Sequence, residues 1–410
     1  MKDGVANESL NGLRVAGKRA LGQALQDARL RTLRLLDHYE AALGRSMNVP
    51  LTSNINPPRW EFGHVGWFAD WWLTRNPDRA RGLQADPTVG RLPARQAGRG
   101  VNADALYDSS AIAHDRRWTL ALPSAAETRT DLIDSLADAL SCLEAASDDD
   151  QGLYFFRLSL FHEDMHAEAA AYMAQTLGFD PEYDLDEGPQ THVVAGELTV
   201  APAQVRLGYE GSGFCFDNEL GLDVIRTAEF QIDTRALTWG QYVPFIESGG
   251  YTDPRWWCES GWTWRCSGNR SLPRYLRRGV SSFWEVLRFG RWQPLDLSTT
   301  VVHVSTFEAQ AWCRWAQRRL PTEAEWVAAA QSGAGFKWGQ VWEWTASAFQ
   351  PFHGFIAHPY RDYSQPWFDG RPVLKGACAA TWARMRHVQY RNFSPPERDD
   401  IFAGFRSVAL

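Results

Sequence analysis

A chain of 410 residues with 44% hydrophobic and 22% charged residues has the composition of a soluble globular protein and the length of two or three domains. A net charge of −7, without a basic stripe interleaved with aromatic residues, excludes nucleic-acid binding as the expected function. The opening MKDGVANESLNG lacks the apolar core of a signal peptide, and no apolar run approaches the ~20 residues that span a bilayer. We therefore expect a cytoplasmic protein that contacts neither nucleic acid nor a membrane. Its six cysteines lack CxxC spacing and are expected to be reduced thiols; they lie at positions 142, 215, 258, 266, 313 and 378.

Four segments in the first part of the chain carry Leu and Ala at helical spacing. They cover residues 19–43, 59–73, 127–146 and 154–178, and a loop-rich piece with many Pro, Gly and Arg residues lies between about 76 and 122. Amphipathic segments of this length predict a four-helix bundle, which we assign to residues 10–180.

Tryptophan is the compositional outlier of the chain, with 20 residues. These gather at positions 60–72 and again at 256–264. Since a buried indole needs an acceptor for its N–H, the clusters predict apolar packing mixed with polar pockets. An aromatic lining for a cation is the functional interpretation, and a plain core is the commoner one.

The fourth helical segment contains the sequence FHEDMHAEAAAYM (161–173). His162 and His166 are four residues apart, so they lie on one face of the helix and are able to share a metal ion. Met165 lies on the same face. Such a pair is as often made of packed or solvated histidines, so a metal site needs a third ligand from elsewhere in the chain.

Two carboxylates of this segment, Asp164 and Glu168, point away from the histidine face. We expect them either to orient the ligand histidines through hydrogen bonds or to lie on a solvated face. Helical spacing alone does not decide between these two interpretations.

A third histidine is available on the second helical segment, within PPRWEFGHVGWFADWW (57–72). Metal sites in bundles are built from side chains on facing helices, so His64 completes a set with His162 and His166. Three neutral imidazoles suit Fe(II), zinc or copper, and the coordination positions left open are typical of a catalytic site. The other histidines show no comparable spacing; they lie at positions 38, 114, 192, 303, 353, 358 and 387.

The composition and the hydrophobic pattern of the sequence change after Gly178. Residues 181–190 are acidic and contain Pro and Gly, which indicates a linker. Beyond the linker lie short strand-like runs, such as 191–201 and 202–210, and one helical pattern at 306–319, set among irregular loops. We therefore expect a loop-rich α+β domain over residues 191–410.

The segments PPRWEFGHVGWF (57–68) and HEDMHAE (162–168) together resemble the two-part iron signature of the ergothioneine sulfoxide synthases and the related selenoneine synthases. Members of this family join a DinB-like four-helix bundle to a C-type-lectin-like domain of the formylglycine-generating, sulfatase-modifying type. The second half of the chain is similar to that domain at residues 249–262, 304–326, 341–347 and 391–406. The resemblance covers nearly the whole chain in the expected order. The Glu and Trp residues of 319–326 and 341–347 are expected to brace loops around the core.

The resemblance implies an O₂-dependent, non-heme Fe(II) enzyme. Such enzymes attach sulfur, or in one branch selenium, to the imidazole C2 of hercynine, the trimethylated betaine of histidine. By this resemblance His64, His162 and His166 hold the iron. A tyrosine near the iron donates a proton or hydrogen atom in the sulfoxide-forming members, and Tyr360 and Tyr363 are the candidates here.

Two departures from the family pattern concern the substrates. Met165 stands where ergothioneine synthases carry a glutamine that helps to hold hercynine. The pattern Arg-Asn-Trp-Asp, followed four residues later by Arg, reads here as Arg391-Asn392-Phe393-Ser394 and then Arg398. Asn392, with Phe393 beside it, remains a candidate hercynine contact, whereas Ser394 cannot supply the carboxylate that serves a γ-glutamylcysteine donor. Arg398 is a candidate to hold an anionic group or sugar hydroxyls.

These departures favour the selenium branch, in which a selenosugar replaces the peptide thiol. The first alternative is an ergothioneine sulfoxide synthase that uses cysteine or γ-glutamylcysteine. The second is a zinc-dependent DinB-like thiol transferase or hydrolase without O₂ chemistry, and the third is a non-enzymatic scaffold, which the histidine triad disfavours. Formylglycine generation itself is not expected, because Cys313 and Cys378 do not match the cysteine pair that it uses.

Overall fold

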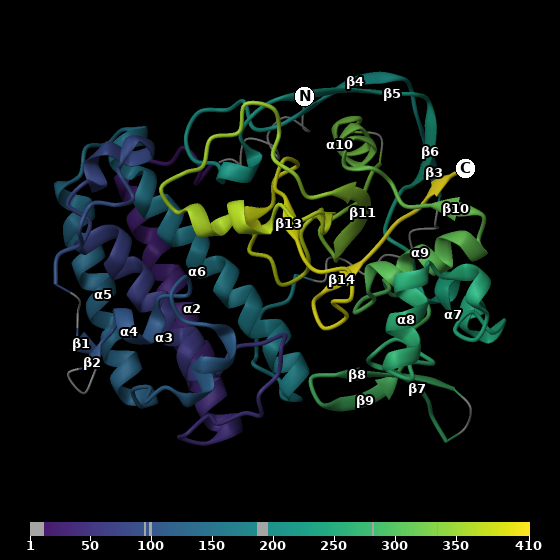
Figure 1. Ribbon diagram of the computed structural model, residues 1–410, viewed down its shortest axis with the longest axis horizontal. Coiled ribbons are helices and arrows are strands. Elements are labelled where there is room, and N and C mark those ends of the chain that lie inside the picture. Colours follow the sequence, from purple (N-terminus) through teal and green to yellow (C-terminus); the bar gives the residue numbers. More distant parts are fainter. Residues whose placement is uncertain (1–11, 94–95, 98–100, 187–195, 281–282, 334) are drawn as a thin grey trace.

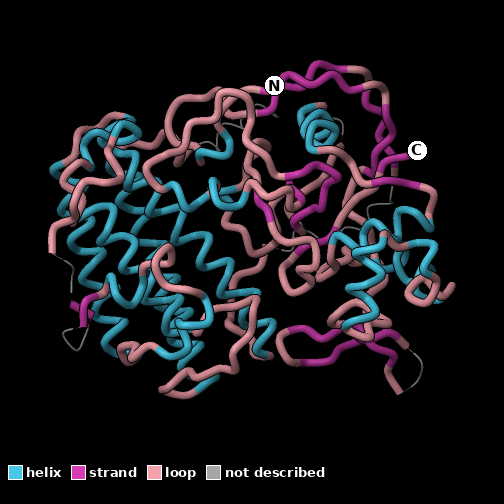
Figure 2. The backbone as a smooth tube through the Cα atoms, viewed as in Figure 1, coloured by secondary structure: helices cyan, strands magenta, loops and turns pink. Residues whose placement is uncertain are grey.

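The computed structural model describes residues 12–93, 96–97, 101–186, 196–280, 283–333 and 335–410. Helices fill the chain up to about residue 180, and short strands, helices and long loops follow beyond residue 196 (Figures 1 and 2). The fold is thus a helical bundle followed by a loop-rich α+β domain, as the sequence predicts. Among the described helices, none combines the length and apolarity needed to cross a membrane.

Four long helices form the bundle: α2 (Lys18–Leu43), α3 (Pro58–Ala69), α5 (Ala125–Ala145) and α6 (Asp150–Leu177). They agree within a few residues with the four helical segments expected from the sequence, and α3 continues into a π-helical turn, Asp70–Thr74. Local capping residues determine where some of these helices begin and end. α5 opens on a capping box of Ser124 and Glu127, and α6 ends at Gly178, whose φ of +82° suits glycine.

The piece between α3 and α5 contains short elements. These are two 3₁₀ turns, Arg79–Gln84 and His114–Thr119, the strands β1 (Gln96–Ala97) and β2 (Val101–Asn102), and one helical turn, α4 (Asp104–Tyr107). Asp104 fixes this turn to the bundle, because it accepts hydrogen bonds from Trp67 Nε1 at 2.7 Å and from Arg75 at 2.7 and 2.8 Å. α4 is therefore held against the helix that carries His64.

Two four-stranded sheets frame the second part of the chain. One is antiparallel, in the order β10 (Arg318–Arg319), β15 (Val408–Ala409), β6 (Phe230–Asp233) and β3 (Glu197–Val200). The other runs β13 (Asn392–Phe393), β12 (Pro372–Lys375), β11 (Trp342–Ala348) and β14 (Ala403–Gly404), with β11 and β14 parallel. Of the strand-like run 191–201, residues 191–195 lie outside the described residues, as do 187–190 of the expected linker.

Hairpins and helices surround these sheets. β4 (Ala203–Leu207) pairs with β5 (Asp223–Thr227), and β7 (Leu276–Arg278), β8 (Trp284–Arg288) and β9 (Arg291–Pro294) form a three-stranded sheet. The helices are α7 (Trp239–Glu247), α8 (Glu259–Ser267), α9 (Thr306–Trp315) and α10 (Glu323–Gln331). The helical pattern expected at 306–319 ends earlier, at Trp315, because Arg318 and Arg319 form β10.

The Glu and Trp residues of 319–326 and 341–347 have the bracing role expected of them. Trp326 is fully buried and donates its indole N–H to Glu343 at 2.8 Å. Glu343 also accepts a hydrogen bond from buried Arg406 at 2.7 Å, and Glu325 closes the capping box of α10 with Thr322. All six cysteines are free thiols, as predicted.

α6 joins the two parts of the molecule, and this overturns both interpretations of its two carboxylates. Asp164 is 1% exposed and forms ion pairs with Arg31 of α2 and, at 2.6 Å, with Arg384 of the second part. Glu168 accepts hydrogen bonds from Trp342 Nε1 at 2.7 Å and from the Thr381 hydroxyl at 2.5 Å. Neither carboxylate orients a histidine or lies on a solvated face, because the side of α6 opposite the histidines packs against the second domain.

Candidate metal centre

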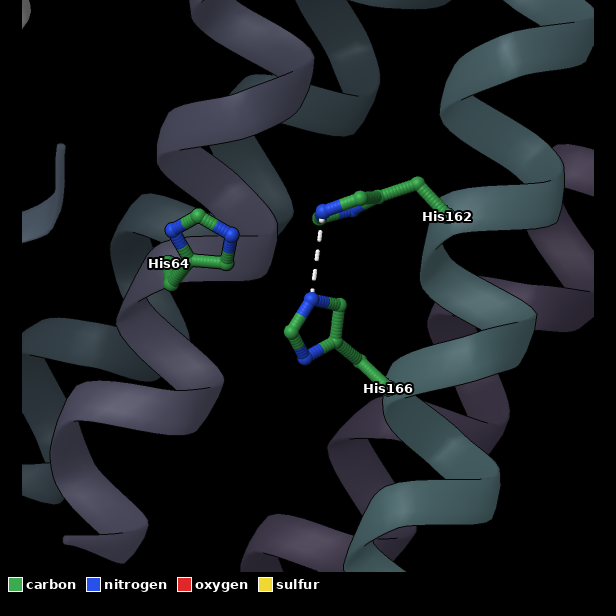
Figure 3. A group of neighbouring side chains, drawn as sticks. All are labelled: His64, His162 and His166. Atoms are coloured by element: carbon green, nitrogen blue, oxygen red, sulfur yellow. Dashed lines mark hydrogen bonds between the residues drawn. The ribbon is translucent and has the colours of Figure 1, made fainter. Parts of the chain in front are cut away.

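Three histidines from two facing helices converge in the bundle (Figure 3). His64 comes from α3, and His162 and His166 come from α6; one ring nitrogen from each lies within 4.8 Å of the others. The Nε2 atoms of His162 and His166 are 3.1 Å apart. Two nitrogens bound at right angles to one ion, each about 2.1 Å from it, are themselves about 3 Å apart, so this spacing suits a shared metal.

Hydrogen bonds on the outer side of two rings select which nitrogen faces the centre. His64 donates from Nδ1 to the backbone carbonyl of Tyr107 at 2.8 Å, and His166 donates from Nδ1 to Glu61 Oε1 at 2.6 Å. With Nδ1 protonated, the neutral ring presents the Nε2 lone pair as a ligand. The arrangement is that of a metal-binding triad with two of its rings locked.

Burial keeps two of the three rings neutral. Burial, reinforced by the neighbouring His166, lowers the pKa of His64 to about 3. Burial also lowers the pKa of His162 well below its ordinary value, with His166 and His64 acting in the same direction. Burial alone would raise the pKa of Glu61, but its pairing with His166 brings the pKa below normal, so the carboxylate stays ionised. Neutral imidazoles at neutral pH are the form that binds a divalent cation.

Aromatic side chains enclose the triad. Trp60 stacks on His64 with ring centroids 4.8 Å apart, and Phe68 stacks on His162 at 3.4 Å. Trp67 lies 5.4 Å from His64 on the other side. Two tryptophans of the cluster at 60–72, Trp60 and Trp67, therefore contact a histidine of the triad and are at the same time part of the buried core, so the cluster combines core packing with contact to the triad.

The two candidate tyrosines occupy different positions. Tyr360 meets the metal pocket directly: its ring lies edge-on to His162 at 6.2 Å and to Phe68 at 5.0 Å. Tyr363 lies farther back, where its ring stacks on Phe216 at 4.5 Å and its hydroxyl bonds to Tyr390. The geometry thus brings Tyr360, and not Tyr363, against a histidine of the triad.

The remaining predicted site residues lie on α6 and in the segment that contains β13. Met165 is half-buried on α6. Asn392 is half-buried and its side-chain oxygen accepts the backbone N–H of Phe393 at 2.8 Å, while Phe393 stacks on Phe349 at 4.1 Å. Ser394 is 9% exposed.

Arg398 is already engaged. It donates to the two carboxylate oxygens of Asp400 at 2.6 and 3.1 Å, and its guanidinium lies 5.6 Å from the ring of Tyr172 on α6. An arginine with a bidentate carboxylate partner has little capacity left for an anionic ligand. The expectation that Arg398 holds an anion is therefore not supported by its contacts.

Several residues that shape the pocket were not identified from the sequence. Glu61 could have been identified from the sequence, because it lies three residues before His64 and shares its helical face. Tyr107 could not have been identified from the sequence, because it contributes a backbone carbonyl and not its side chain. Arg117 lies 3.9 Å over Trp60, and Arg91 lies 4.9 Å from both Trp71 and Trp72; each has guanidinium nitrogens without a partner among the described atoms.

A separate cavity of about 390 Å³ lies away from this centre. It is bounded by the C-terminal part of α6, the β8–β9 hairpin and the segment 295–303, and the three histidines are not among its lining residues. The histidine triad, and not this cavity, is therefore the candidate functional site.

Known proteins share both halves of this arrangement. The family model described as the sulfatase-modifying factor enzyme 1-like domain matches residues 183–340. The chain is 30% identical to the hercynine oxygenase of Mycolicibacterium thermoresistibile over 97% of this chain and 96% of that protein. It is also 30% identical to the hercynine oxygenase of Mycobacterium tuberculosis over 93% of this chain and 96% of that protein. The formylglycine-generating enzyme of Thermomonospora curvata is 30% identical over 39% of this chain and 58% of its own length.

Proposed function

This chain belongs to the hercynine oxygenase family, and we propose that it is a selenoneine synthase that uses Fe(II), O₂ and a selenosugar to form a C–Se bond at the imidazole C2 of hercynine. It is an oxygen-dependent oxidoreductase acting on a small molecule, as its relatives' names state. The observation that carries the site assignment is the convergence of His64, His162 and His166 on one point.

The donor set fits a divalent transition metal. Three neutral imidazole ligands suit Fe(II), and two of them are locked by Glu61 and the Tyr107 carbonyl, so little reorganisation accompanies binding. When bound there, Fe(II) supplies the redox chemistry with O₂ and a meeting point for the chalcogen donor and hercynine.

The walls of the pocket match the charge pattern of hercynine, which carries a quaternary ammonium and a carboxylate. The indole of Trp67, whose ring centroid lies 5.4 Å from that of His64, provides an electron-rich surface for the ammonium group. Arg117, with a free guanidinium nitrogen among the described atoms, offers a cation for the carboxylate. Tyr360 is the residue that holds or gives a proton at its hydroxyl in this proposal, and Tyr363 supports it from behind.

Two features favour a neutral donor over γ-glutamylcysteine. Ser394 offers no carboxylate for the donor's amine, and Arg398 is paired with Asp400 instead of being available for a donor carboxylate. A sugar hydroxyl is able to bond to the serine and to the outer edge of such an ion pair without displacing it. Met165 adds a soft thioether beside the ligand histidines, which is compatible with a selenium donor.

Donor choice is tested by supplying the iron-loaded protein with hercynine, O₂ and either a selenosugar, cysteine or γ-glutamylcysteine. We expect the highest kcat/KM with the selenosugar, measured by mass spectrometry of the product. A clear preference for either thiol would instead assign the chain as an ergothioneine sulfoxide synthase, which is the alternative that its named relatives favour. The Met165→Gln variant is expected to shift this preference, whereas Met165→Leu, which keeps apolar volume, serves as its matched control.

The metal is tested separately. Protein prepared anaerobically and loaded with Fe(II) is expected to consume O₂ when hercynine and the donor are present, and His162→Ala is expected to lose both iron and O₂ uptake while its helical circular dichroism is retained. A protein that retains zinc and consumes no O₂ would instead support the DinB-like thiol transferase.

A further inference from the structure

The segment that carries both tyrosines, residues 358–364, is here named the tyrosine loop. It is held at both ends by one buried turn, Asp217–Glu219. The Ser364 hydroxyl donates to Asp217 Oδ1 and accepts from Asn218 Nδ2 at 3.1 Å, and the backbone N–H of His358 lies beside the same Asp217 carboxyl. One carboxylate therefore contacts the loop just before Tyr360 and just after Tyr363.

A small cavity of about 10 Å³ lies between this turn and the loop. It is enclosed by buried side chains from α6, from the segment before the turn and from the loop itself: Tyr154, Leu158, Phe214, Phe216, Asp217, His358, Tyr360 and Tyr363. The surface of this cavity is apolar, so the tyrosine loop packs against the turn with little empty space between them.

Two polar atoms of the cavity-lining residues lack a partner among the described protein atoms: Asp217 Oδ2 and His358 Nε2. Asp217 is 2% exposed and His358 is 6% exposed, so bulk solvent does not satisfy them. His358 Nδ1 is paired with the Tyr154 hydroxyl at 2.9 Å. The hydrogen bond to Tyr154 therefore fixes the His358 end of the tyrosine loop to α6.

We propose that Asp217 is a positioning residue for the reaction: its carboxylate, bonded to the Ser364 hydroxyl and lying beside the backbone N–H of His358, holds Tyr360 against the metal pocket. The inference rests on the proposed function of Tyr360. Asp217 does not touch the histidine triad in this arrangement. Its effect reaches the reacting groups through the tyrosine loop, whose ring at Tyr360 lies 6.2 Å from that of His162.

The ionised form of Asp217 is the form that accepts from both partners. Burial raises the pKa of Asp217 to about 6, so the carboxylate loses this capacity when the pH falls through about 6. Burial lowers the pKa of His358 to about 4, so this ring stays neutral over the same range. The titratable groups that face Asp217 are Cys215 and Glu219 from its own segment, Tyr154 from α6, and His358, Tyr360 and Tyr363 from the tyrosine loop.

The test compares wild type with Asp217→Asn, both loaded with Fe(II), for hercynine turnover and O₂ consumption between pH 5 and pH 8.5. We expect the wild-type kcat to fall below about pH 6 and the variant to lack this step. At pH 7.5 the variant is expected to have an unchanged KM for hercynine, a kcat lower by about tenfold to a hundredfold, and more O₂ consumed per product formed. Asp369→Asn makes the same chemical change in an exposed loop of the same domain and is expected to match wild type.

Ser364→Ala provides a second variant if Asp217→Asn does not fold. It removes one contact of the loop and is expected to lower kcat while keeping the step near pH 6. A kcat and pH profile of Asp217→Asn equal to those of wild type would overturn the inference. Absence of turnover in wild type would count against the proposed function instead. Crystal structures of wild type and Asp217→Asn then test the inference: a displaced tyrosine loop in the variant would support it, and an unchanged loop would overturn it.

Discussion

At the residue scale, the hydrogen bond from His166 Nδ1 to Glu61 determines which ring nitrogen is available to a metal. We expect Glu61→Gln to lower iron affinity by about 10- to 100-fold, because a neutral amide is a weaker acceptor and orients the ring less firmly. Competition with a chelator, followed by the iron content of the protein, measures the change. Glu168→Gln is the matched control: Glu168 lies on α6 two residues after His166, but it bonds to Trp342 and Thr381 on the opposite side of the helix, so the iron affinity of this variant should equal that of wild type.

Removing the hydroxyl of Tyr360 and that of Tyr363 is expected to affect product formation differently. Tyr360→Phe keeps the ring that meets His162 and Phe68 and removes the hydroxyl, so product formation should fall by about 10²-fold or more if that hydroxyl moves a proton. Iron binding should not change. Tyr363→Phe should cost only a few-fold, because its ring stacks on Phe216 away from the triad. Single-turnover product yield measures both; a larger loss in Tyr363→Phe would reverse the assignment.

At the element scale, the approach of α3 to α4 fixes the acceptor behind His64. A Cβ atom at Gly63 would lie 2.3 Å from the ring of Tyr107, which is 3% exposed and has little room to move. We expect Gly63→Ala to reduce the free energy of unfolding by about 1–3 kcal/mol and to weaken iron binding, since the Tyr107 carbonyl moves with its ring.

Gly66→Ala, one turn along α3, separates this contact from a general effect of substituting helical glycines. Its Cβ would meet Leu132 at an ordinary 3.4 Å, and alanine favours the helix by up to about 1 kcal/mol. Urea unfolding and chelator competition on both variants measure the difference. Equal effects at the two positions would show that the α3–α4 contact is not specific to the metal centre.

The helices and strands also show which parts of the fold were predictable from the sequence. The four helices follow from the local spacing of Leu and Ala, and the pairing of His162 with His166 follows from helical geometry alone. The two-residue strands β10, β13, β14 and β15 are too short for a period of two to appear, so they were not predictable. Glu168 was misassigned because a helix face opposite a metal site meets either water or another domain, and spacing does not distinguish these.

At the scale of the whole molecule, the site depends on two domains that meet along α6. The triad lies in the bundle, whereas Tyr360 belongs to the second part, which reaches α6 through buried polar contacts. Arg14, on the first turn of the described chain, similarly pairs with Glu219, next to Asp217. Such pairs between residues some 200 positions apart are invisible to sequence spacing, and they are what sets the pocket geometry.

The interdomain pair between Asp164 and Arg384 gives the prediction for this scale. Asp164 lies between the two α6 ligands in the sequence, and its two oxygens bond to Arg384 at 2.6 and 2.8 Å. In Arg384→Ala the buried carboxylate keeps Arg31 alone, so we expect the free energy of unfolding to fall by about 3 kcal/mol. We also expect kcat to fall while iron content is unchanged, because the triad is intact but the second domain, with Tyr360, is held less firmly against it. Urea unfolding, iron analysis and turnover measure these effects. Arg255→Ala is the control: Arg255 pairs with Asp253 at the surface, where its loss should leave the free energy of unfolding essentially unchanged. Loss of iron together with activity in Arg384→Ala would show that the interface holds the triad itself, and unchanged turnover would show that the bundle places Tyr360 without this pair.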